Sequence, residues 1–231
     1  MLHTVMHNAL YEIKGGKKIP GRFKTVYAES YPEFNARAIH PKSNLMHVIA
    51  SGEDYEQILM KSLLRHDVTS IVVGEIREHE VGLYKRASVQ GIKQLLGTLH
   101  DLDPLDIPGI MSDLYLQYYS NGLNAESVHR TFVRNLHFSI SMDEFLFGED
   151  GNENLQKIVT GIHFYDIDSK TKETKLFTIM EYDVFNNEWI FNNDIPDRIV
   201  RMVTKYNKRE YLEFRDTLQQ LSGNVKEEVT V

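Results

Sequence analysis

The sequence contains no cysteine among its 231 residues, so neither a disulfide framework nor a thiolate metal site can form. No apolar run approaches the roughly 18 residues that a membrane-spanning helix needs, and the first residues lack the apolar region of a signal peptide. The formal net charge is −7 at pH 7, whereas broad nucleic-acid affinity rests on clustered lysine and arginine. These absences favour a cytoplasmic protein that does not itself bind nucleic acid.

The composition is that of a globular protein, with 42% hydrophobic and 26% charged residues. This length suits one full core, or one domain with an appendage. Residues before Asn135 read as alternating strands and helices, whereas Asn135 begins a series of alternating β-branched and aromatic runs. We therefore predict one domain over residues 1–134, a β-meander with helices over 135–222, and a disordered polar tail over 223–231.

The segment from Ser70 to His100 carries the densest set of candidate functional residues. Its first run, Ile71-Val72-Val73, is typical of a buried parallel strand and ends at Gly74-Glu75. A helix over 77–90 and a second strand over 94–99 should follow, which brings Thr98 and His100 to the same sheet edge. Open α/β sheets bind ligands at that edge, so the layout predicts a phosphate-handling site. An ordinary βαβ unit with solvated strand-end residues is the alternative.

Three motifs in this order resemble those of the secretion, pilus and conjugation ATPases of the type II/type IV secretion superfamily. The segment resembling the Walker B strand comprises Leu64-Arg65, Asp67 and Gly74-Glu75-Ile76-Arg77. Gly91 and Thr98-Leu99-His100 resemble the family's His box, and residues 28–34, with sequence AESYPEF, resemble its acidic box. The resemblance is strong over residues 22–100. It is looser over the meander, which is similar to the C-terminal part of the conjugation and tight-adherence branch.

The resemblance implies a RecA-like α/β ATPase core that uses ATP and Mg²⁺. It assigns to Glu75 the catalytic role of the Walker B acid, which holds Mg²⁺ or its water and orients the attacking water. It makes Glu29 a second catalytic acid, which positions Mg²⁺ through water or polarises the nucleophile. His100 would report on the γ-phosphate. The residues expected to contact the nucleotide are Gly74, Arg77, Thr98 and Arg65. Glu33 is expected to be structural, and nothing local supports a role for Arg37.

The sequence departs from the family pattern at several points. No G-x-x-x-x-G-K-[ST] phosphate loop occurs anywhere in it, and Gly15-Gly16-Lys17-Lys18 is predicted to be a helix-terminating turn. Ile92 replaces the first histidine of the His box, and Ser30 replaces the usual aspartate of the acidic box. Val68-Thr69 replaces the customary Pro-Asp. A metal-hydrolase reading, based on His100 with Asp103 or on His79 with Glu80, is weaker because no third ligand follows at helix or strand spacing.

Apolar residues recur at helical spacing from Leu2 to Ile13, which predicts an amphipathic helix directly before the acidic-box strand. In the family, the helix at that place grows out of the phosphate loop. We therefore expect either a product that lacks an upstream phosphate loop or a relative that has lost it.

Further elements are expected on both sides of this segment. Strands are predicted over 22–28 and 44–50, with helices over 55–65, 105–119 and 125–134. At the C-terminal end, two helices are predicted, over 196–206 and 211–221.

The sequence thus predicts an ATPase, or the C-terminal part of one, that powers protein secretion, pilus assembly or conjugative DNA transfer. By resemblance, a homo-hexamer would work at the periphery of inner-membrane machinery. The alternative is a non-catalytic relative that keeps the fold in order to dock to the apparatus.

Overall fold

The computed structural model describes most of the chain, in two compact units. The first unit comprises residues 1–101 and 109–128, and the second comprises 102–108 and 129–231. The residues outside the description are 1–9, 15–16, 22, 33–34, 51–54, 56, 58, 60, 62–66, 101–102, 120–121, 148–153, 169, 172 and 229–231. The units divide within helix α6, Ala125–Asn135, and the functional domain boundaries remain a prediction.

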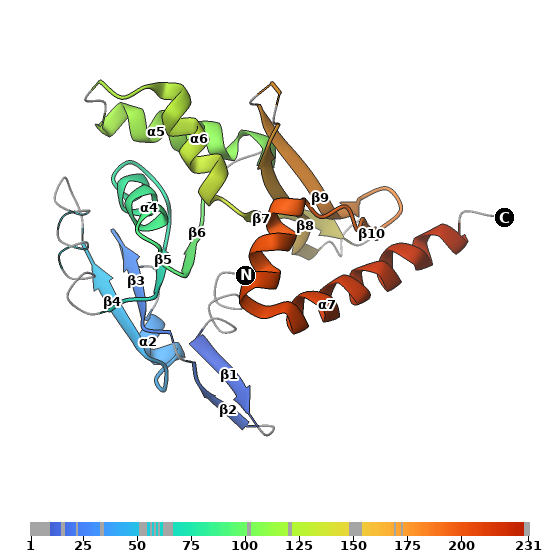
Figure 1. Cartoon of the computed structure of the whole chain (residues 1–231). Helices are drawn as coiled ribbons and strands as arrows, with labels where there is room; N and C mark the ends of the chain where they lie inside the picture. Colours follow the sequence, from blue (N-terminus) through green and yellow to red (C-terminus); the bar gives the residue numbers. More distant parts are fainter. Residues whose placement is uncertain are drawn as a thin grey trace. The chain divides into compact units, whose positions relative to one another are not determined.

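The first unit is built on a four-stranded parallel sheet in the order β4-β3-β5-β6 (Figure 1). These strands are Leu45–Ile49, Thr25–Glu29, Ser70–Val73 and Gln94–Gly97. Every residue of β3 and β5 is buried, as expected for central strands of a parallel sheet that is covered on both faces. The predicted strands are therefore confirmed, as is the α/β class.

Helices flank this sheet. Helix α2, Ala36–Ile39, lies next to β4, and α4, Glu80–Val89, connects β5 to β6 and packs beside them (Figure 1). The predicted helix over 77–90 is thus confirmed, with a start three residues later. A short 3₁₀ turn, Pro104–Asp106, precedes α5, Ile107–Tyr119, and α6 follows, so the helices predicted over 105–119 and 125–134 are confirmed. Much of the helix predicted over 55–65 lies outside the described residues. A core cluster in this unit contains Leu10, Tyr27, Ala36, Leu45 and Val72.

The predicted N-terminal helix is wrong over its last part. Residues Tyr11–Lys14 form strand β1, which pairs antiparallel with β2, Lys17–Pro20, in a separate two-stranded sheet (Figure 1). Leu10 alone of the earlier residues is described; it is helical and buried, and residues 1–9 lie outside the description. Tyr11 and Ile13 are aromatic and β-branched, so the strand propensity of these residues prevails over the helical spacing.

The second unit is an antiparallel sheet in the order β10-β9-β8-β7, which confirms the predicted meander. Its strands are Phe138–Phe147, Asn154–Ile167, Thr174–Asp183 and Glu188–Phe191, named β7 to β10 in that order. The register shifts between Ser141 and Met142 and again between Ile162 and His163. Such bulges increase the local twist of a sheet.

The two predicted C-terminal helices are one helix, α7, Asp197–Glu228. No glycine or proline interrupts residues 197–222, so the sequence contains no residue that would end the first predicted helix. The predicted polar tail from Gly223 begins inside this helix. Among the helices that the structure describes, none combines the length and apolar character needed to cross a bilayer.

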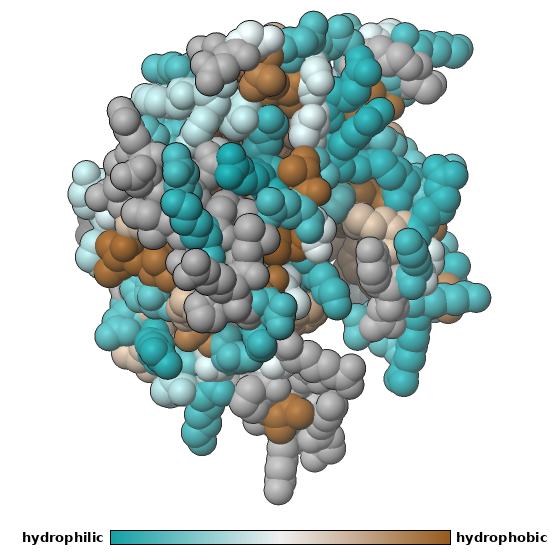
Figure 2. Space-filling model, turned by 60° about the vertical axis from the view of Figure 1, so that its left-hand side comes forward, coloured by the Kyte–Doolittle hydropathy of each residue, from teal (hydrophilic) through white to brown (hydrophobic). Residues whose placement is uncertain are grey.

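Arg198 ties α7 to the rest of the second unit. Its guanidinium donates to the carbonyl oxygen of Arg134 at 2.7 Å and to that of Tyr165, and its Nε lies 3.3 Å from Asp166. Beside it, Val133, Leu136 and Tyr165 form a buried core cluster. At the surface, the face drawn in Figure 2 carries separate brown apolar patches within a mainly hydrophilic surface.

Candidate active site at the strand ends

The carboxyl ends of β3, β5 and β6 carry most of the predicted site residues. Glu29 is the last residue of β3, Gly74-Glu75 directly follow β5, and Thr98 directly follows β6. The three strands are parallel neighbours in register, so their ends meet at one edge of the sheet. Open α/β sheets bind their ligands at this edge. The predicted layout of strand, acid, crossover and strand is therefore present in the first unit.

Glu75 lies between two cationic or potentially cationic groups. The Nη2 atom of Arg77 is 2.5 Å from its Oε2, and the Nε2 atom of His100 is 3.6 Å from its Oε1. The Glu75 side chain is 18% exposed, whereas that of His100 is 92% exposed. An exposed ion pair contributes little to stability, so the importance of this arrangement lies in where it holds the Glu75 carboxylate. The structure brings together Glu75, Arg77 and His100, and the position of His100 at this edge agrees with the predicted spacing.

Gly74 and Thr98 connect the two strand ends. The Thr98 hydroxyl donates to the carbonyl oxygen of Gly74, and the backbone N–H of Ile76 donates to the carbonyl oxygen of Thr98 at 2.7 Å. Both bonds cross from the end of β6 to the segment that carries Glu75. Thr98 therefore already has a structural role in holding the Glu75 segment.

Glu29 is buried, with 3% of its surface exposed, and its carboxylate is held on both sides. The Tyr27 hydroxyl donates to Oε2 at 2.8 Å, and the Nε2 atom of His47 lies 2.6 Å from Oε1. Tyr27 and His47 are paired across β3 and β4, with ring centroids 5.2 Å apart. Sequence reasoning missed His47, because only the parallel pairing of two strands brings it to Glu29.

A second buried acid lies near Glu29. Glu80, at the start of α4, is 5% exposed and accepts a hydrogen bond from the Ser30 hydroxyl. The Tyr55 side chain is fully buried, and within the described part of the chain its hydroxyl has no hydrogen-bond partner. Burial, followed by the charges of Glu80 and Glu29, raises the pKa of Tyr55 far above its usual range. The site is therefore rich in buried carboxylates.

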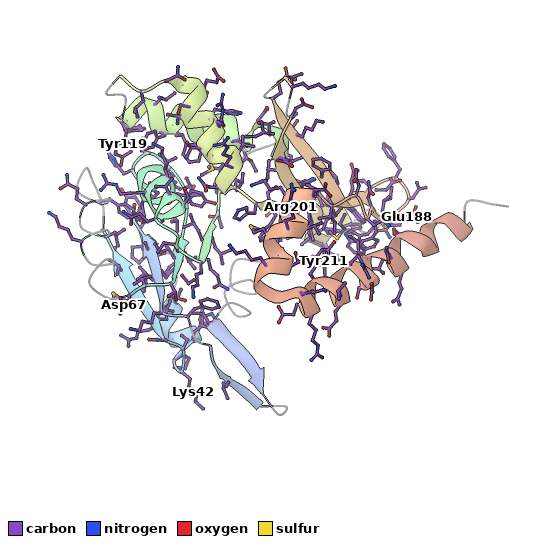
Figure 3. All side chains as sticks on the ribbon, in the orientation of Figure 1. Lys42, Asp67, Tyr119, Glu188, Arg201 and Tyr211 are labelled. Carbon is purple, nitrogen blue, oxygen red and sulfur yellow. The ribbon has the colours of Figure 1, made fainter. Side chains whose placement is uncertain are left out.

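Aromatic residues of α5 hold the beginning of α4 in place. The Tyr119 hydroxyl donates to the carbonyl oxygen of His79 at 3.2 Å, and its ring fills the space where a Cβ on Gly82 would lie. The ring of Tyr118 packs edge-on against His79, with centroids 5.4 Å apart. The labelled Tyr119 side chain lies beside α4 in Figure 3. These contacts fix the segment that follows Glu75 and Arg77.

Of the two acids that the resemblance assigns to Mg²⁺, Glu75 keeps its carboxylate partly open to a metal ion or its water. Among the described residues, no group of three histidine, aspartate or glutamate side chains is placed to hold a metal ion. Both oxygens of Glu29 already have protein partners, whereas the Glu75 carboxylate is partly open to solvent. Arg65, the remaining predicted contact, lies outside the described residues.

The fold is that of secretion ATPases. The VirB11 ATPase of the Brucella suis type IV secretion system aligns with a TM-score of 0.50 and 18% identity, over 70% of this chain and 44% of that one. The Legionella pneumophila ATPase DotB aligns at 0.48 and 14% identity, over 71% and 42% of the two chains. The pilus retraction motor PilT aligns at 0.37 and 16% identity, over 82% and 43%. The resemblance inferred from the three motifs is thus confirmed at the level of the RecA-like fold.

The sequence matches no protein-family model and none of the curated proteins at a significant level. The chain spans less than half the length of each of the three solved structures that it resembles. The fold similarity therefore supports a partial RecA-like core with an added antiparallel sheet.

Proposed function

We propose that this chain belongs to an ATPase of the secretion and pilus type. It would supply the residues that promote hydrolysis at the nucleotide site, whereas a phosphate loop would bind the phosphates. The observation that carries the proposal is the position of Glu75 at the carboxyl end of β5, between Arg77 and His100. Phosphoryl transfer relies on positioning and electrostatics, and a carboxylate at this strand end suits the task of orienting a water molecule.

In this proposal each residue acts through its own chemistry. Glu75 would accept a hydrogen bond from the attacking water, and it would hold Mg²⁺ through water when a nucleotide brings the ion. Arg77 and His100 supply positive charge near the transferred phosphoryl group, His100 when protonated. Both carboxylate oxygens of Glu29 are bound by Tyr27 and His47, so Glu29 contributes a fixed negative charge near this edge and does not bind a metal ion directly. Mg²⁺ supplies charge neutralisation when it is bound.

The proposed function also implies an oligomeric state and a location. On the resemblance of the sequence motifs alone, we propose a homo-hexamer that works at an inner-membrane apparatus. Such an ATPase would power protein secretion, pilus assembly or conjugation. We further propose a cytoplasmic location, in which the apparatus and not this acidic chain handles any nucleic acid.

A non-catalytic role in docking to the apparatus is the second candidate. Two observations favour it: the sequence contains no phosphate loop, and both oxygens of Glu29 are bound within the chain. A relative that keeps the sheet only as a docking surface would retain the buried contacts of Glu29 with Tyr27 and His47 and would not hydrolyse ATP.

The test uses a version of the protein in which a phosphate-loop segment precedes this chain. Glu75→Gln in that version should bind ATP and hydrolyse it on the order of 10²-fold more slowly, because the amide loses the charge that orients water. His100→Ala should reduce turnover less. Glu78→Gln, a change at a nearby exposed acid, serves as the control. Equal turnover of Glu75→Gln and the parent protein would remove Glu75 from the site and favour the docking role.

A further inference from the structure

Strand β9 of the second unit is covered by another strand along only part of its outer edge. Strand β10 pairs with residues 180–183, and the backbone N–H of Asn192 donates to the carbonyl oxygen of Ile179 at 2.9 Å (Figure 1). In the described part of the chain, no strand pairs on that side with residues 174–178. One part of the edge is therefore covered by an extended strand, and the rest is open.

The open part of β9 directs backbone groups away from the sheet at every second residue. Tyr165 on β8 lies opposite Leu176, but its N–H donates at 3.2 Å to the carbonyl oxygen of His137, on the other side of β8. Tyr165 and Leu176 therefore form a pair without mutual backbone hydrogen bonds, and the N–H and C=O of Leu176 point away from β8. Because this direction alternates along a strand, the backbone groups of Thr174 and Thr178 point the same way.

A hollow of about 440 Å³ lies along this open edge. It is lined by four consecutive residues of β9, 175–178, together with Asn192 and Asp194 from the segment after β10. Side chains of a strand alternate between the two faces of a sheet, so four consecutive residues around one hollow place it at the strand's edge. The hollow thus lies beside the residues of β9 that precede those paired with β10.

The usual devices that protect a strand edge are weak here. Proteins commonly place proline or a charged side chain, often lysine, on an open edge. Strand β9 contains no proline, and the Nζ atom of its one lysine, Lys175, lies 2.7 Å from Oδ2 of Asp168 in the same hairpin. The charge of Lys175 is therefore balanced within the hairpin, and it does not favour a charged occupant of the edge.

We propose that an extended, uncharged segment of a partner protein adds to β9 as a further antiparallel strand, in line with β10. The outward backbone groups need donors and acceptors at the two-residue spacing that an extended chain supplies. The Leu176 side chain packs against the buried cluster that contains Tyr165, so an apolar, β-branched residue opposite it extends that cluster. This function is independent of the site at Glu75, because every residue involved lies in the second unit.

The probe is a short, dye-labelled peptide of alternating valine and threonine, prepared with N-methyl groups on either the threonines or the valines. With a valine opposite Leu176, the valines direct their N–H groups at β9 and the threonines direct theirs away. Fluorescence anisotropy with the intact protein should show saturable binding of the threonine-methylated peptide. The valine-methylated peptide should bind more than about tenfold more weakly. Both peptides carry the same side chains, so the difference measures the backbone bonds to β9.

Amide hydrogen exchange locates the binding site within the chain. In the free protein the N–H of Leu176 should exchange rapidly, whereas that of Phe177, which points at β8, should be protected. The threonine-methylated peptide should slow exchange at Leu176 about tenfold or more and leave Phe177 unchanged.

A proline variant tests the edge from the side of the protein. Thr174→Pro removes an outward N–H at the first residue of β9, a position where proline does not break the ladder with β8. It should weaken the threonine-methylated peptide about tenfold. Thr174→Ala is the matched control, because it also loses the 3.0 Å contact of the Thr174 hydroxyl with His129 but keeps the N–H. That variant should bind the peptide as the parent does.

Three results would overturn the proposal. The first is no saturable binding of either peptide, and the second is equal affinity for both. The third is slow exchange of the Leu176 N–H in the free protein, together with a concentration-dependent dimer in light scattering. That result would assign the open edge to a second copy of this chain instead of a partner protein.

Discussion

The Nε2 atom of His47 lies 2.6 Å from Oε1 of Glu29, across two neighbouring parallel strands. The other carboxylate oxygen accepts the Tyr27 hydroxyl, so a buried acid is satisfied wholly by residues of its own sheet face. A buried carboxylate is costly unless it is hydrogen-bonded. The conformation of the Glu29 end of β3 therefore depends on a histidine that is distant in the sequence.

We predict that His47→Ala destabilises the first unit by about 1.5–3 kcal/mol, because the Glu29 carboxylate loses a hydrogen-bond partner while staying buried. The midpoint of urea unfolding should fall with little change in slope. His47→Gln keeps a side-chain donor and should cost less. If His47→Ala unfolds at the same urea concentration as the parent, the contact with Glu29 does not stabilise this edge.

Gly74 should tolerate no side chain. A Cβ there would lie 2.9 Å from the Tyr27 hydroxyl and 3.1 Å from the Glu29 Cβ, so Gly74→Ala must displace the hydrogen-bonded pair. We expect a loss of about 1–3 kcal/mol in the free energy of unfolding. Gly109→Ala is the matched control, because nothing lies within 4 Å of its Cβ position in helix α5. That change should stabilise the protein by about 0.5–1 kcal/mol, since alanine is the better helix former.

The outcome at Gly74→Ala is informative in either direction. Equal stability of the two glycine variants would show that Tyr27 and Glu29 can move apart without penalty. The position of the Glu75 segment would then not depend on the contact between Tyr27 and Glu29.

The second unit should lose stability in mild acid. Burial, and then the charge of Arg198, lowers the pKa of His137 below the ordinary 6.5. Burial likewise lowers the pKa of His163, although Glu181 and Asp103 act in the opposite direction. Below the ordinary value the unfolded chain binds more protons than the folded one. The stabilising contribution is therefore full above about pH 6.5 and is lost as the pH falls through the lowered values.

Urea unfolding between about pH 7.5 and about pH 5, followed by Trp189 fluorescence, measures this loss. The variants His137→Gln and His163→Gln are neutral over this range, so each should flatten the dependence of stability on pH. A double variant with the same pH dependence as the parent would show that the two histidines do not cause it.

Much of the site could be predicted because parallel strands bring sequence-distant residues to one edge. Apolar runs such as Ile71-Val72-Val73 identify buried strands, and the residue after each run then lies at the carboxyl end. This reasoning found Glu75, Thr98 and His100. It could not find His47, which lies within a strand, because the contact with Glu29 depends on the pairing register and on which face each side chain occupies.

The wrong elements have a related cause. Helical spacing from Leu2 to Ile13 is equally compatible with a short hairpin when aromatic and β-branched residues are present, and Tyr11–Lys14 forms a strand. The break predicted within α7 falls on the polar residues 207–210, and polar residues alone do not end a helix.

The chain as printed should neither bind ATP tightly nor hydrolyse it. Tight phosphate binding in this fold relies on the amides and the lysine of a phosphate loop, and the sequence has no such motif. Glu75 and the buried acids near it would repel a triphosphate in the absence of Mg²⁺, and the net charge of −7 adds weakly to that repulsion. Arg77 is the main opposing charge, and its ion pair with Glu75 at 2.5 Å weakens the attraction that it offers to a phosphate.

A fluorescent ATP analogue titrated with Mg²⁺ into the purified chain tests this expectation. We expect no saturation in the micromolar range and no phosphate release above that of buffer. Glu75→Ala and the control Glu173→Ala should then behave like the parent. Saturable micromolar binding that Glu75→Ala abolishes and Glu173→Ala preserves would mean that the strand-end residues form a complete phosphate site by themselves. In that case Arg77 and His100 would have to supply the charge that a phosphate loop normally provides.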